Sequence, residues 1–257
     1  RVHGRVIPNG TITGRMTHRN PNMAQVPNIH SPFGKECRAC WSVPEGYKLV
    51  GIDASGLELR MLAHYMNDSN YIEEVVNGDI HSTNQELAGL KTRDQAKTFI
   101  YALVYGAGDA KIGSIINGDI KKGKALKNRF FSNLPALKKL RDRVQQAANR
   151  GFLKGIDGRK IHVRSQHAAL NTLLQGSGAI VMKQAMINLY ELIKLNVVDA
   201  HFVANIHDEW QLQVKESQAD YIGRLGVECI EKVTEQFKMR CDLTGEYKIG
   251  GNWSETH

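Results

Sequence analysis

Two carboxylates that follow apolar segments are the first candidates for chemistry in this sequence. Asp53 closes the segment YKLVGID, and a short turn follows it. Asp208 precedes Glu209 in the segment FVANIHDEWQLQV, where β-type residues lie on both sides. Carboxylates at strand ends beside sharp turns often bind metals or take part in catalysis. A helix N-cap is the alternative for Asp53, and an ordinary polar turn is the alternative for Asp208 and Glu209.

Strand pairing would bring these carboxylates together. Asp53 and Asp208 lie 155 positions apart, but both reach one point if the two strands lie side by side. The flanking apolar strands predict that Asp208 and Glu209 are exposed together at a hairpin tip. Hard oxygen ligands of this type suit Mg²⁺, which prefers a few carboxylates, waters and substrate phosphates.

A helix with an unusual charge distribution is predicted between these two sites, over TRDQAKTFIYALVYG (Thr92–Gly106). Thr92 and Gln95 form a capping box at its start. Four residues at four-residue spacing share one face: Arg93, Lys97, Tyr101 and Tyr105. Two cations near an electropositive helix start are unfavourable, and a bound triphosphate would reverse this cost. An amphipathic surface helix with solvated cations is the alternative.

The elements that must position these groups indicate an α+β fold. A hairpin is predicted with strands at Arg38–Val43 and Tyr47–Asp53, and another at 152–164 turns at Asp157-Gly158. Residues 67–150 are mostly helical, and Gly78-Asp79-Ile80-His81 opens one of their helices. Further helices are predicted at 166–195 and 216–237, after which the chain returns as a strand.

Two of these elements allow predictions of side-chain orientation. In the strand after Asp208, apolar residues alternate with Gln211, Gln213 and Lys215, which predicts a half-buried strand. In the helix at 166–195, Asn171 and Gln175 form a polar pair one turn apart, for which ordinary helix surface is the alternative to a function. Seven residues of that helix are predicted to point inward: Leu170, Leu173, Leu174, Ile180, Val181, Ile187 and Leu192.

Composition favours an anionic partner. The net charge is +8 and the pI is near 9.3, and nucleic acid is the commonest partner of basic proteins. Residues 121–143 hold nine Lys or Arg against one Asp, an excess that exceeds what solubility requires, although most of it is expected to be solvated. Arg5, Arg15, His18 and Arg19 lie in a Gly- and Pro-rich segment that is either a surface meander or a cradle for a phosphodiester backbone.

Other features exclude several classes of protein. Four cysteines do not make a disulfide scaffold in 257 residues. Cys37 and Cys40 form a lone CxxC in a predicted strand, where they would face opposite sides, so a zinc site is not expected. No run of 18 apolar residues predicts a membrane span. Because the chain starts at Arg1, we expect it to be a piece of a longer protein.

Three motifs in order resemble those of the family A DNA polymerases, closest to the short T7-like phage replicative enzymes. Asp53-Ala-Ser-Gly-Leu-Glu58-Leu-Arg60 resembles motif A, and the spacing from Arg93 to Gly106 resembles motif B of the fingers. Ile206-His207-Asp208-Glu209 resembles motif C, and Thr13-Gly14-Arg15 resembles an upstream segment that touches the primer–template. Gly56 stands where many cellular members have Gln. The resemblance covers essentially all of the chain.

The resemblance implies roles for individual residues in template-directed DNA synthesis. Two Mg²⁺ ions would be held by Asp53, Asp208 and the carbonyl of Ala54, and they would activate the primer 3′-hydroxyl and hold the triphosphate. The implied catalytic residues are Asp53, Asp208, Glu209 and Lys97. The implied nucleotide-binding residues are Arg93, Lys97, Tyr101, Tyr105, His81, Glu58 and Ala54, with Glu58 crowding the sugar 2′ position. The implied DNA-binding residues are Arg15, Asn171, Gln175 and His207.

The resemblance also implies an architecture and partners. It predicts a palm with an antiparallel sheet (1–66 and 152–257), with inserted helical fingers (67–151). A thumb and a 3′–5′ exonuclease would precede Arg1, in the same protein or in a split partner. A thumb-binding processivity factor therefore has no expected docking site here. The implied ligands are primer–template DNA and dNTP, without a membrane, in the cytoplasm of a host cell.

Three alternatives remain at the level of sequence. A single-subunit RNA polymerase shares these motifs, but it normally lacks an acidic residue like Glu58 and carries Met at the position of Tyr101. A non-catalytic DNA-binding module has no need of Asp53, Asp208 and the cationic helix together. The third alternative is a fragment that folds but extends no primer without a thumb.

Overall fold

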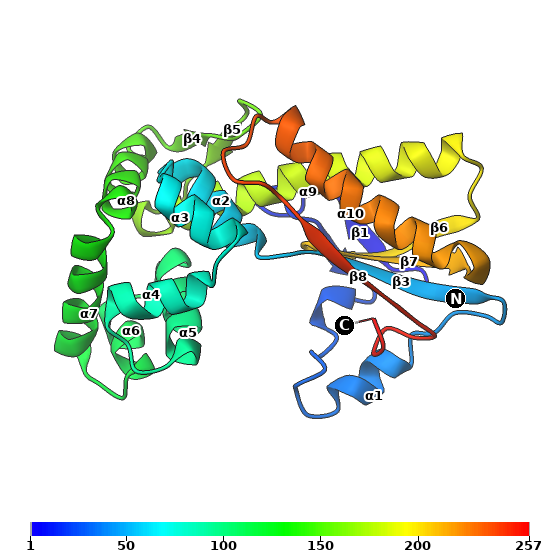
Figure 1. The fold of residues 1–257 in the computed structure, drawn as a ribbon, viewed down its shortest axis with the longest axis horizontal. Coiled ribbons are helices and arrows are strands. Elements are labelled where there is room, and N and C mark those ends of the chain that lie inside the picture. Colours follow the sequence, from blue (N-terminus) through cyan, green and yellow to red (C-terminus); the bar gives the residue numbers. More distant parts are fainter. Residues whose placement is uncertain (1, 257) are drawn as a thin grey trace. The chain divides into compact units, whose positions relative to one another are not determined.

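The computed structural model describes residues 2–256, and contacts divide the chain into two compact units (Figure 1). The first unit comprises Arg1–Leu57 and Gly176–His257, and the second comprises Glu58–Gln175, so the second is inserted into the first in chain order. Both contain helices and antiparallel strands, which confirms the predicted α+β class. The assignment of residues 1–66, 67–151 and 152–257 to palm and fingers stays a prediction.

A four-stranded antiparallel sheet forms the centre of the first unit. Its strand order is β6-β7-β3-β8, and the strands are Ala200–Ile206, Glu209–Lys215, Tyr47–Ala54 and Gly245–Gly250. The strand that leads to Asp53 is thus the direct neighbour of the strand that follows Asp208. Val50, Ile52 and Leu212 are fully buried within this sheet. Each such side chain stabilises the fold by about 1.5–3 kcal/mol on burial, which fixes the scaffold under the carboxylates.

One helix covers a face of this sheet at close range. Helix α10 (Ala219–Gln236) contacts β3, β7 and β8, and Figure 1 shows it lying across the strands. A Cβ added at Gly226 would lie 2.3 Å from Cδ1 of Ile52, and one at Gly223 would lie 2.2 Å from the ring of Tyr247. These glycines therefore allow the helix to approach closely. A short 3-10 helix, η3 (Glu216–Gln218), precedes α10.

The other face of β7 is also buried, so the prediction of a half-buried strand is wrong. Gln211 is 2% exposed and Gln213 is 6% exposed, and Lys215 is the one exposed residue of this described strand. The hydroxyl of Thr256 donates a hydrogen bond to Oε1 of Gln211 at 2.9 Å. The C-terminal residues cover the polar face of β7, and an alternating pattern cannot reveal such a tertiary cover.

The N-terminal part of the first unit holds short elements. Strand β1 (Arg5–Ile7) pairs with β2 (Thr17–Arg19), and a 3-10 helix, η1 (Met23–Gln25), follows. The strand predicted at 38–43 is wrong, because residues Gly34–Ala39 form helix α1. Arg38 donates from Nε to the carbonyl of Pro27 at 2.9 Å, and its guanidinium lies 4.3 Å from the ring centroid of Trp253. These tertiary contacts select the helix against the local pattern.

The second unit is mainly helical. Side chains of Asp68, Asp79, Thr92 and Asp119 accept hydrogen bonds from first-turn backbone N–H groups and so fix four helix starts. Strands β4 (Phe152–Lys154) and β5 (Lys160–His162) form the predicted hairpin. The helices are α2 (Leu57–Met66), α3 (Ser69–Val76), α4 (Ile80–Ala88), α5 (Arg93–Val104), α6 (Asp109–Ile115), α7 (Ile120–Asn133) and α8 (Pro135–Ala148).

A long helix, α9 (Ala169–Leu195), follows the 3-10 helix η2 (Gln166–Ala168) and confirms the predicted helix at 166–195. The inward orientation predicted for Ile187 is wrong, because this side chain is 46% exposed. Ala185 and Leu189 are buried, and at 100° per residue they lie on the opposite side of the helix. Leu192 is half-buried. No helix within residues 2–256 has the length and apolar character needed to cross a membrane.

Candidate active site

The first unit brings the two predicted metal-binding carboxylates to one corner of its sheet. Asp53 is the penultimate residue of β3, and Asp208 lies in the turn between β6 and β7. The backbone N–H of Ala54 donates to the carbonyl oxygen of Asp208 at 3.1 Å. In the strand register, Asp53 lies opposite Glu209 on β7 and opposite Glu246 on β8. The expected side-by-side arrangement of the two strands is therefore present.

Glu209 is held inside the first unit rather than exposed. Its Oε1 accepts hydrogen bonds from Nε1 of Trp253 at 2.8 Å and from Nε2 of Gln211 at 2.6 Å. Glu209 is 6% exposed, so the prediction that both acids of the turn are exposed is wrong for this residue. Successive strand residues point to opposite faces, and the face that Glu209 shares with Gln211 is the one that the C-terminal residues cover.

The turn that presents Asp208 has a strained first residue. His207 has a φ of 61°, in the left-handed region that few residues other than glycine adopt. Such a conformation costs on the order of 1–3 kcal/mol and persists where the surroundings enforce it. Here the pairing of Ile206 with Glu209 closes the hairpin around His207 and Asp208. The strained residue is His207, for which the resemblance to family A polymerases implies a DNA-binding role.

Lys183 on α9 fixes the loop that precedes Arg15 in the first unit. Its Nζ donates to the carbonyl of Pro8 at 2.6 Å, to Oδ1 of Asn9 at 2.7 Å and to the carbonyl of Gly14 at 2.7 Å. A lysine ammonium has three N–H donors, and it makes three hydrogen bonds here. The sequence did not single out Lys183, because its partners lie about 170 positions away.

His18 differs from the surface cation expected in the N-terminal segment. It is 8% exposed, and its Nε2 donates to the carbonyl of Asn205 on β6 at 2.8 Å. His18 therefore ties β2 to the central sheet of the first unit and has a packing role in this structure.

The second unit contains the cationic helix. Thr92 accepts a hydrogen bond from the backbone N–H of Gln95 at 3.2 Å, and Oε1 of Gln95 accepts from the N–H of Lys91 at 3.2 Å. This confirms the predicted helix start, although the return bond reaches one residue before the N-cap. Lys97 is exposed one turn after Arg93. Asp94 in the first turn offsets part of the cationic charge.

Aromatic residues continue the same helix face. The rings of Tyr101 and Tyr105 are stacked, with centroids 6.3 Å apart and planes 29° apart. The ring of His81 from α4 lies 6.2 Å from that of Tyr101. The hydroxyl of Tyr105 donates to Oε1 of Glu58 at 3.3 Å. Four residues with implied nucleotide-binding roles are therefore gathered within the second unit, on α2, α4 and the end of α5.

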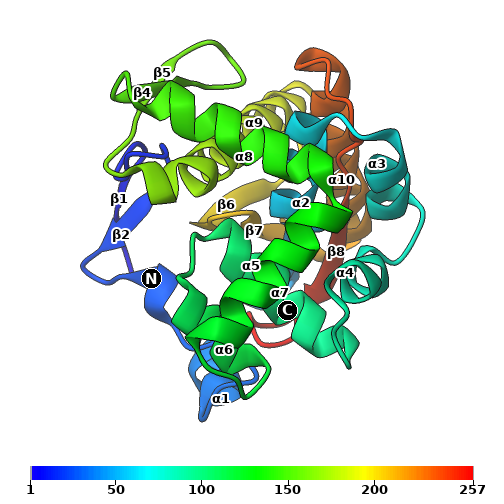
Figure 2. The same ribbon diagram turned by 90° about the vertical axis from the view of Figure 1, so that its left-hand side faces the viewer.

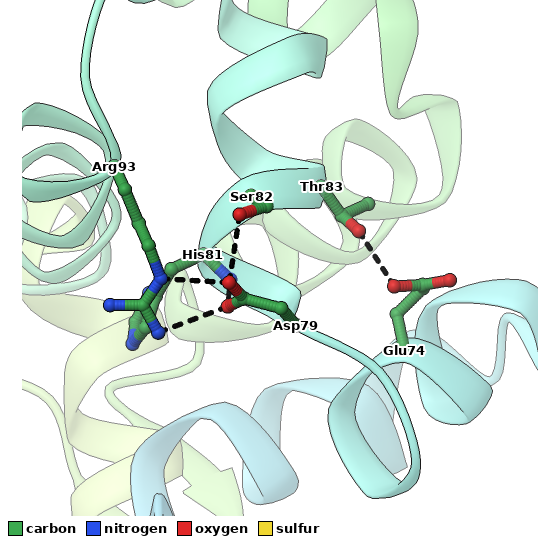
Figure 3. A network of polar contacts seen from close by, with 6 residues as sticks. All are labelled: Glu74, Asp79, His81, Ser82, Thr83 and Arg93. Atoms are coloured by element: carbon green, nitrogen blue, oxygen red, sulfur yellow. Dashed lines mark hydrogen bonds and ion pairs between the residues drawn. The ribbon is translucent and has the colours of Figure 1, made fainter.

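Arg93 has an acidic partner that the sequence prediction missed. Nε of Arg93 donates to Oδ2 of Asp79 at 2.8 Å, and Nη2 donates to Oδ1 at 3.1 Å (Figure 3). The Arg93 guanidinium holds the pKa of the Asp79 carboxyl well below its usual range, and Ser82 adds a further hydrogen bond. The sequence places Asp79 at a helix start, but its pairing with a residue 14 positions later has no local sequence signal.

His81 lies near these cations, and its pKa is shifted by burial and by their charges. Burial lowers its pKa below the ordinary value of 6.5, and the charges of Arg93 and Lys97 lower it further. Its Nδ1 is buried and has no hydrogen-bond partner within residues 2–256. A polar atom in this state is one to which a ligand group can add a hydrogen bond.

The predicted polar pair on α9 lies in the second unit. Asn171 and Gln175 are both partly buried, and Oδ1 of Asn171 is buried without a hydrogen-bond partner among the described residues. This environment differs from the ordinary helix surface that was the alternative for Asn171. Their implied contact with DNA stays a prediction.

Comparisons with known proteins agree with these arrangements. The sequence profile of DNA polymerase family A matches residues 1–255. A DNA-directed DNA polymerase of Enterobacteria phage T3 is 43% identical over 100% of this chain and 41% of its own length. A DNA-directed DNA polymerase of Escherichia phage T7 is 42% identical over 100% of this chain and 41% of its own length. This chain thus spans about two fifths of the length of these phage relatives.

A solved structure shares the fold. It is the POL domain of Pol1 from M. smegmatis, in a complex with DNA primer-template and dNTP. The TM-score is 0.90 at 25% sequence identity, over 100% of this chain and 48% of the other. Because the family profile covers nearly every residue and the motifs lie on the elements described above, the chain belongs to DNA polymerase family A.

Proposed function

We propose that this chain carries out template-directed DNA synthesis by nucleotidyl transfer from dNTP to a primer 3′-hydroxyl. The observation that carries the proposal is the placement of Asp53 beside the turn that holds Asp208, in a chain that matches family A over residues 1–255. In the reaction, the 3′-oxygen forms a bond to the α-phosphorus while the bond to pyrophosphate breaks. The hydroxyl proton passes to solvent, and pyrophosphate is released.

The residues present fit a magnesium site in this corner of the sheet. Asp53, Asp208 and the carbonyl of Ala54 are hard oxygen donors, and the Ala54–Asp208 backbone hydrogen bond joins the segments that carry them. Within residues 2–256, no group of three or more His, Cys, Asp or Glu is placed so that it could hold a metal ion, so the proposed site has only two carboxylates and a carbonyl. Mg²⁺ characteristically keeps waters and substrate phosphates as its other ligands, so an incomplete set suits it. When bound, two such ions supply activation of the hydroxyl and neutralisation of phosphate charge.

The buried Glu209 supports this corner without being exposed itself. Its hydrogen bonds to Trp253 and Gln211 restrain the strand that follows Asp208. A carboxylate orientated by rigid neighbours loses less conformational freedom when it binds a ligand. We therefore assign Glu209 to the support of the catalytic carboxylates.

The cationic helix supplies the groups that suit a nucleotide. Arg93 and Lys97 are exposed cations near a helix start, where anions are favoured. In the proposed function both bind the triphosphate together with His81, while Tyr101 packs on the sugar. Tyr105 and Glu58, which are hydrogen-bonded to each other, lie at the base pair and at the sugar 2′ position.

The proposed partners follow from the same residues. Primer–template DNA is bound through Arg15, Asn171, Gln175 and His207, whose minor-groove contacts check the shape of a base pair more than its sequence. A thumb and an exonuclease from the same protein or from a partner act with this chain, and DNA synthesis takes place inside a host cell. The 41% coverage of the phage relatives supports the participation of further domains.

A primer-extension assay with Mg²⁺ tests the proposal. The chain is assayed alone and with a thumb-containing fragment of a phage relative. Asp208→Asn should reduce extension by more than about 100-fold, since even outer-shell partners of a metal cost 10–100-fold. The affinity for primer–template DNA should be retained.

Asp142→Asn is the matched control, because Asp142 is an exposed acid paired with Arg141 on α8. This variant should extend the primer at the wild-type rate. Extension by Asp208→Asn at the wild-type rate would refute the metal-binding role of Asp208. The absence of extension by the wild-type chain in both conditions would refute DNA synthesis by this chain.

A further inference from the structure

We propose that Asp79 is a positioning residue for triphosphate binding, which holds Arg93 so that the outer edge of its guanidinium receives the phosphates. The inference rests on the proposed function, because it gives Arg93 its ligand. Asp79 itself would not touch the nucleotide. Its effect would pass through Arg93 and through the helix start that carries His81.

Both oxygens of Asp79 are engaged on two sides. Oδ1 accepts from the backbone N–H of His81 at 3.1 Å and from Nη2 of Arg93 at 3.1 Å. Oδ2 accepts from the hydroxyl of Ser82 at 2.7 Å and from Nε of Arg93 at 2.8 Å. Figure 3 shows the carboxylate between the start of α4 and the arginine side chain. A carboxylate with four hydrogen bonds and a helix-capping duty is anchored, so it can serve as a fixed support.

The contact leaves the phosphate-binding edge of Arg93 available. A guanidinium has five N–H donors in a rigid fork, and Asp79 uses the edge formed by Nε and Nη2. Nη1 makes no hydrogen bond within the described chain, so the edge formed by Nη1 and the second N–H of Nη2 remains. That edge presents two parallel donors, the geometry that favours bidentate binding of phosphate.

The exposure of the pair indicates orientation rather than stability as its role. The side chains of Arg93 and Asp79 are 51% and 45% exposed. Exposed ion pairs contribute little to folding because solvent screens them. A long arginine side chain, however, loses considerable rotamer freedom when it binds a ligand. A partner such as Asp79, which holds the arginine side chain in one orientation before the ligand arrives, lowers the entropic cost of binding.

One carboxylate thus organises two of the predicted phosphate ligands. The N–H of His81 and the guanidinium of Arg93 share Oδ1 of Asp79, although α4 and α5 are separate helices. A second polar link, from the hydroxyl of Thr83 to Oε2 of Glu74 at 2.8 Å, ties α4 to α3 (Figure 3). The start of α4 is therefore restrained from two sides.

Asp79→Asn separates the capping duty from the ion pair. Asparagine is as good an N-cap as aspartate, so α4 should keep its start, while the charge that holds Arg93 is removed. Binding of inorganic tripolyphosphate to the chain is measured by isothermal titration calorimetry. We expect the dissociation constant to rise about five- to tenfold, the size expected for one charge-assisted contact. The thermal midpoint should stay unchanged.

A double-mutant cycle shows whether Asp79 acts through Arg93. In an Arg93→Gln background, Asp79→Asn should leave the tripolyphosphate affinity unchanged, because the residue to be positioned is gone. An equal loss in both backgrounds would overturn the inference and indicate a structural role.

Tighter binding by Asp79→Asn would also overturn the inference, since it would make Asp79 a competitor for Arg93. Unchanged affinity in the single variant would overturn it while leaving the proposed function intact. Failure of the wild-type chain to bind tripolyphosphate would instead refute the nucleotide-binding role of α5, and the inference with it. The single variant and the wild-type chain thus separate the two failures.

Discussion

Arg93 and its surroundings show how a cation is accommodated where a helix disfavours it. The first turn of α5 carries the positive end of the helix dipole, which repels Arg93. Asp79 offsets this repulsion through two hydrogen bonds, and Asp94 adds a second negative charge in the same turn. The fold therefore keeps a cation at this position without requiring a bound anion. In the proposed function, the nucleotide then meets an arginine that is already ordered.

His81 should take up a proton when a triphosphate binds. Its pKa is lowered by burial first and then by the charges of Arg93 and Lys97. A bound triphosphate would partly neutralise these two cations and so raise the pKa of His81. Between the lowered pKa and about pH 6.5, the binding of tripolyphosphate should therefore be accompanied by proton uptake. Calorimetry in buffers of different ionisation enthalpy measures this uptake.

His81→Gln is the control, because it removes the titrating group. Proton uptake that is equal in this variant would show that another group is responsible. The same shift has a sign for stability: the unfolded chain binds more protons at this residue than the native chain. The contribution of His81 therefore favours the native state above the ordinary pKa and declines as the pH falls below it.

At the scale of elements, the contact of α10 with the sheet depends on Gly226. A methyl group at this position would lie 2.3 Å from Cδ1 of Ile52, which is fully buried. We expect Gly226→Ala to lower the free energy of unfolding by about 1–3 kcal/mol through overpacking, despite the better helix propensity of alanine. Urea unfolding followed by circular dichroism measures the change.

Gly251→Ala is the matched control for this substitution. A Cβ at Gly251 has its nearest neighbour at 3.6 Å, an ordinary contact distance. Its effect on the free energy of unfolding should stay within about 0.5 kcal/mol. Equal stability of Gly226→Ala and the wild type would show that the helix can shift away from β3.

The elements with strong local signals were predictable from the sequence. The cap at Thr92 and the β6–β7 hairpin were recognised because neighbouring residues encode them. The helix α1 and the burial of Glu209 and Gln211 were not, because each depends on the C-terminal residues, above all Trp253. Residues that are close in sequence hold no information on which distant segment will cover them. Strand propensity and the alternation of apolar residues therefore gave wrong predictions for α1 and β7.

The sequence could point to a candidate site at Asp53, Asp208 and α5 because motif spacing is itself a local signal. The roles of these residues stay predictions. Two supporting residues had no local signal: Asp79, which holds Arg93, and Lys183, which holds the loop before Arg15. Asp79 has a partner in a different helix, and Lys183 has partners at the other end of the chain. Supporting contacts of this kind arise only when the chain is folded.

At the scale of the whole molecule, the charge of +8 predicts salt-dependent binding to DNA. Each duplex phosphate that the protein neutralises contributes about −0.9 to the slope of log affinity against log salt concentration. Lys121 and Lys124 are exposed on α7, within the basic segment 121–143. We expect Lys121→Gln with Lys124→Gln to make the slope shallower by about 0.9 for each phosphate that is no longer neutralised. Fluorescence anisotropy between about 50 and 200 mM KCl measures it, by the same linkage.

Lys127→Gln serves as the control on the same helix. Its Nζ is paired with Oδ1 of Asp109 at 2.9 Å, so its charge is already compensated and the slope should change little. A slope unaffected by the double substitution would identify this face of α7 as a solvated surface. The excess of cations in 121–143 would then have no role in binding DNA.

The order of the two units along the chain determines where the chain crosses from one unit to the other. The second unit is inserted into the first, so the chain passes from one unit to the other at 57/58 and again at 175/176. The second passage lies within the continuous helix α9, which is labelled in Figure 2. Asp53 lies four residues before the first passage, and Gln175 ends the second unit. Both unit boundaries therefore lie close in sequence to residues with proposed catalytic or DNA-binding roles.

The register that sets Asp53 opposite Glu209 and Glu246 also limits how the gene can change in length. Side chains alternate between the faces of a strand, so one codon gained in the middle of β3 would turn Asp53 to the opposite face. A codon gained in the turn at 44–46, before the strand begins, would leave that alignment intact. Lineages that descend from this gene should therefore vary in length at the turns, while the codon count of β3 is inherited unchanged.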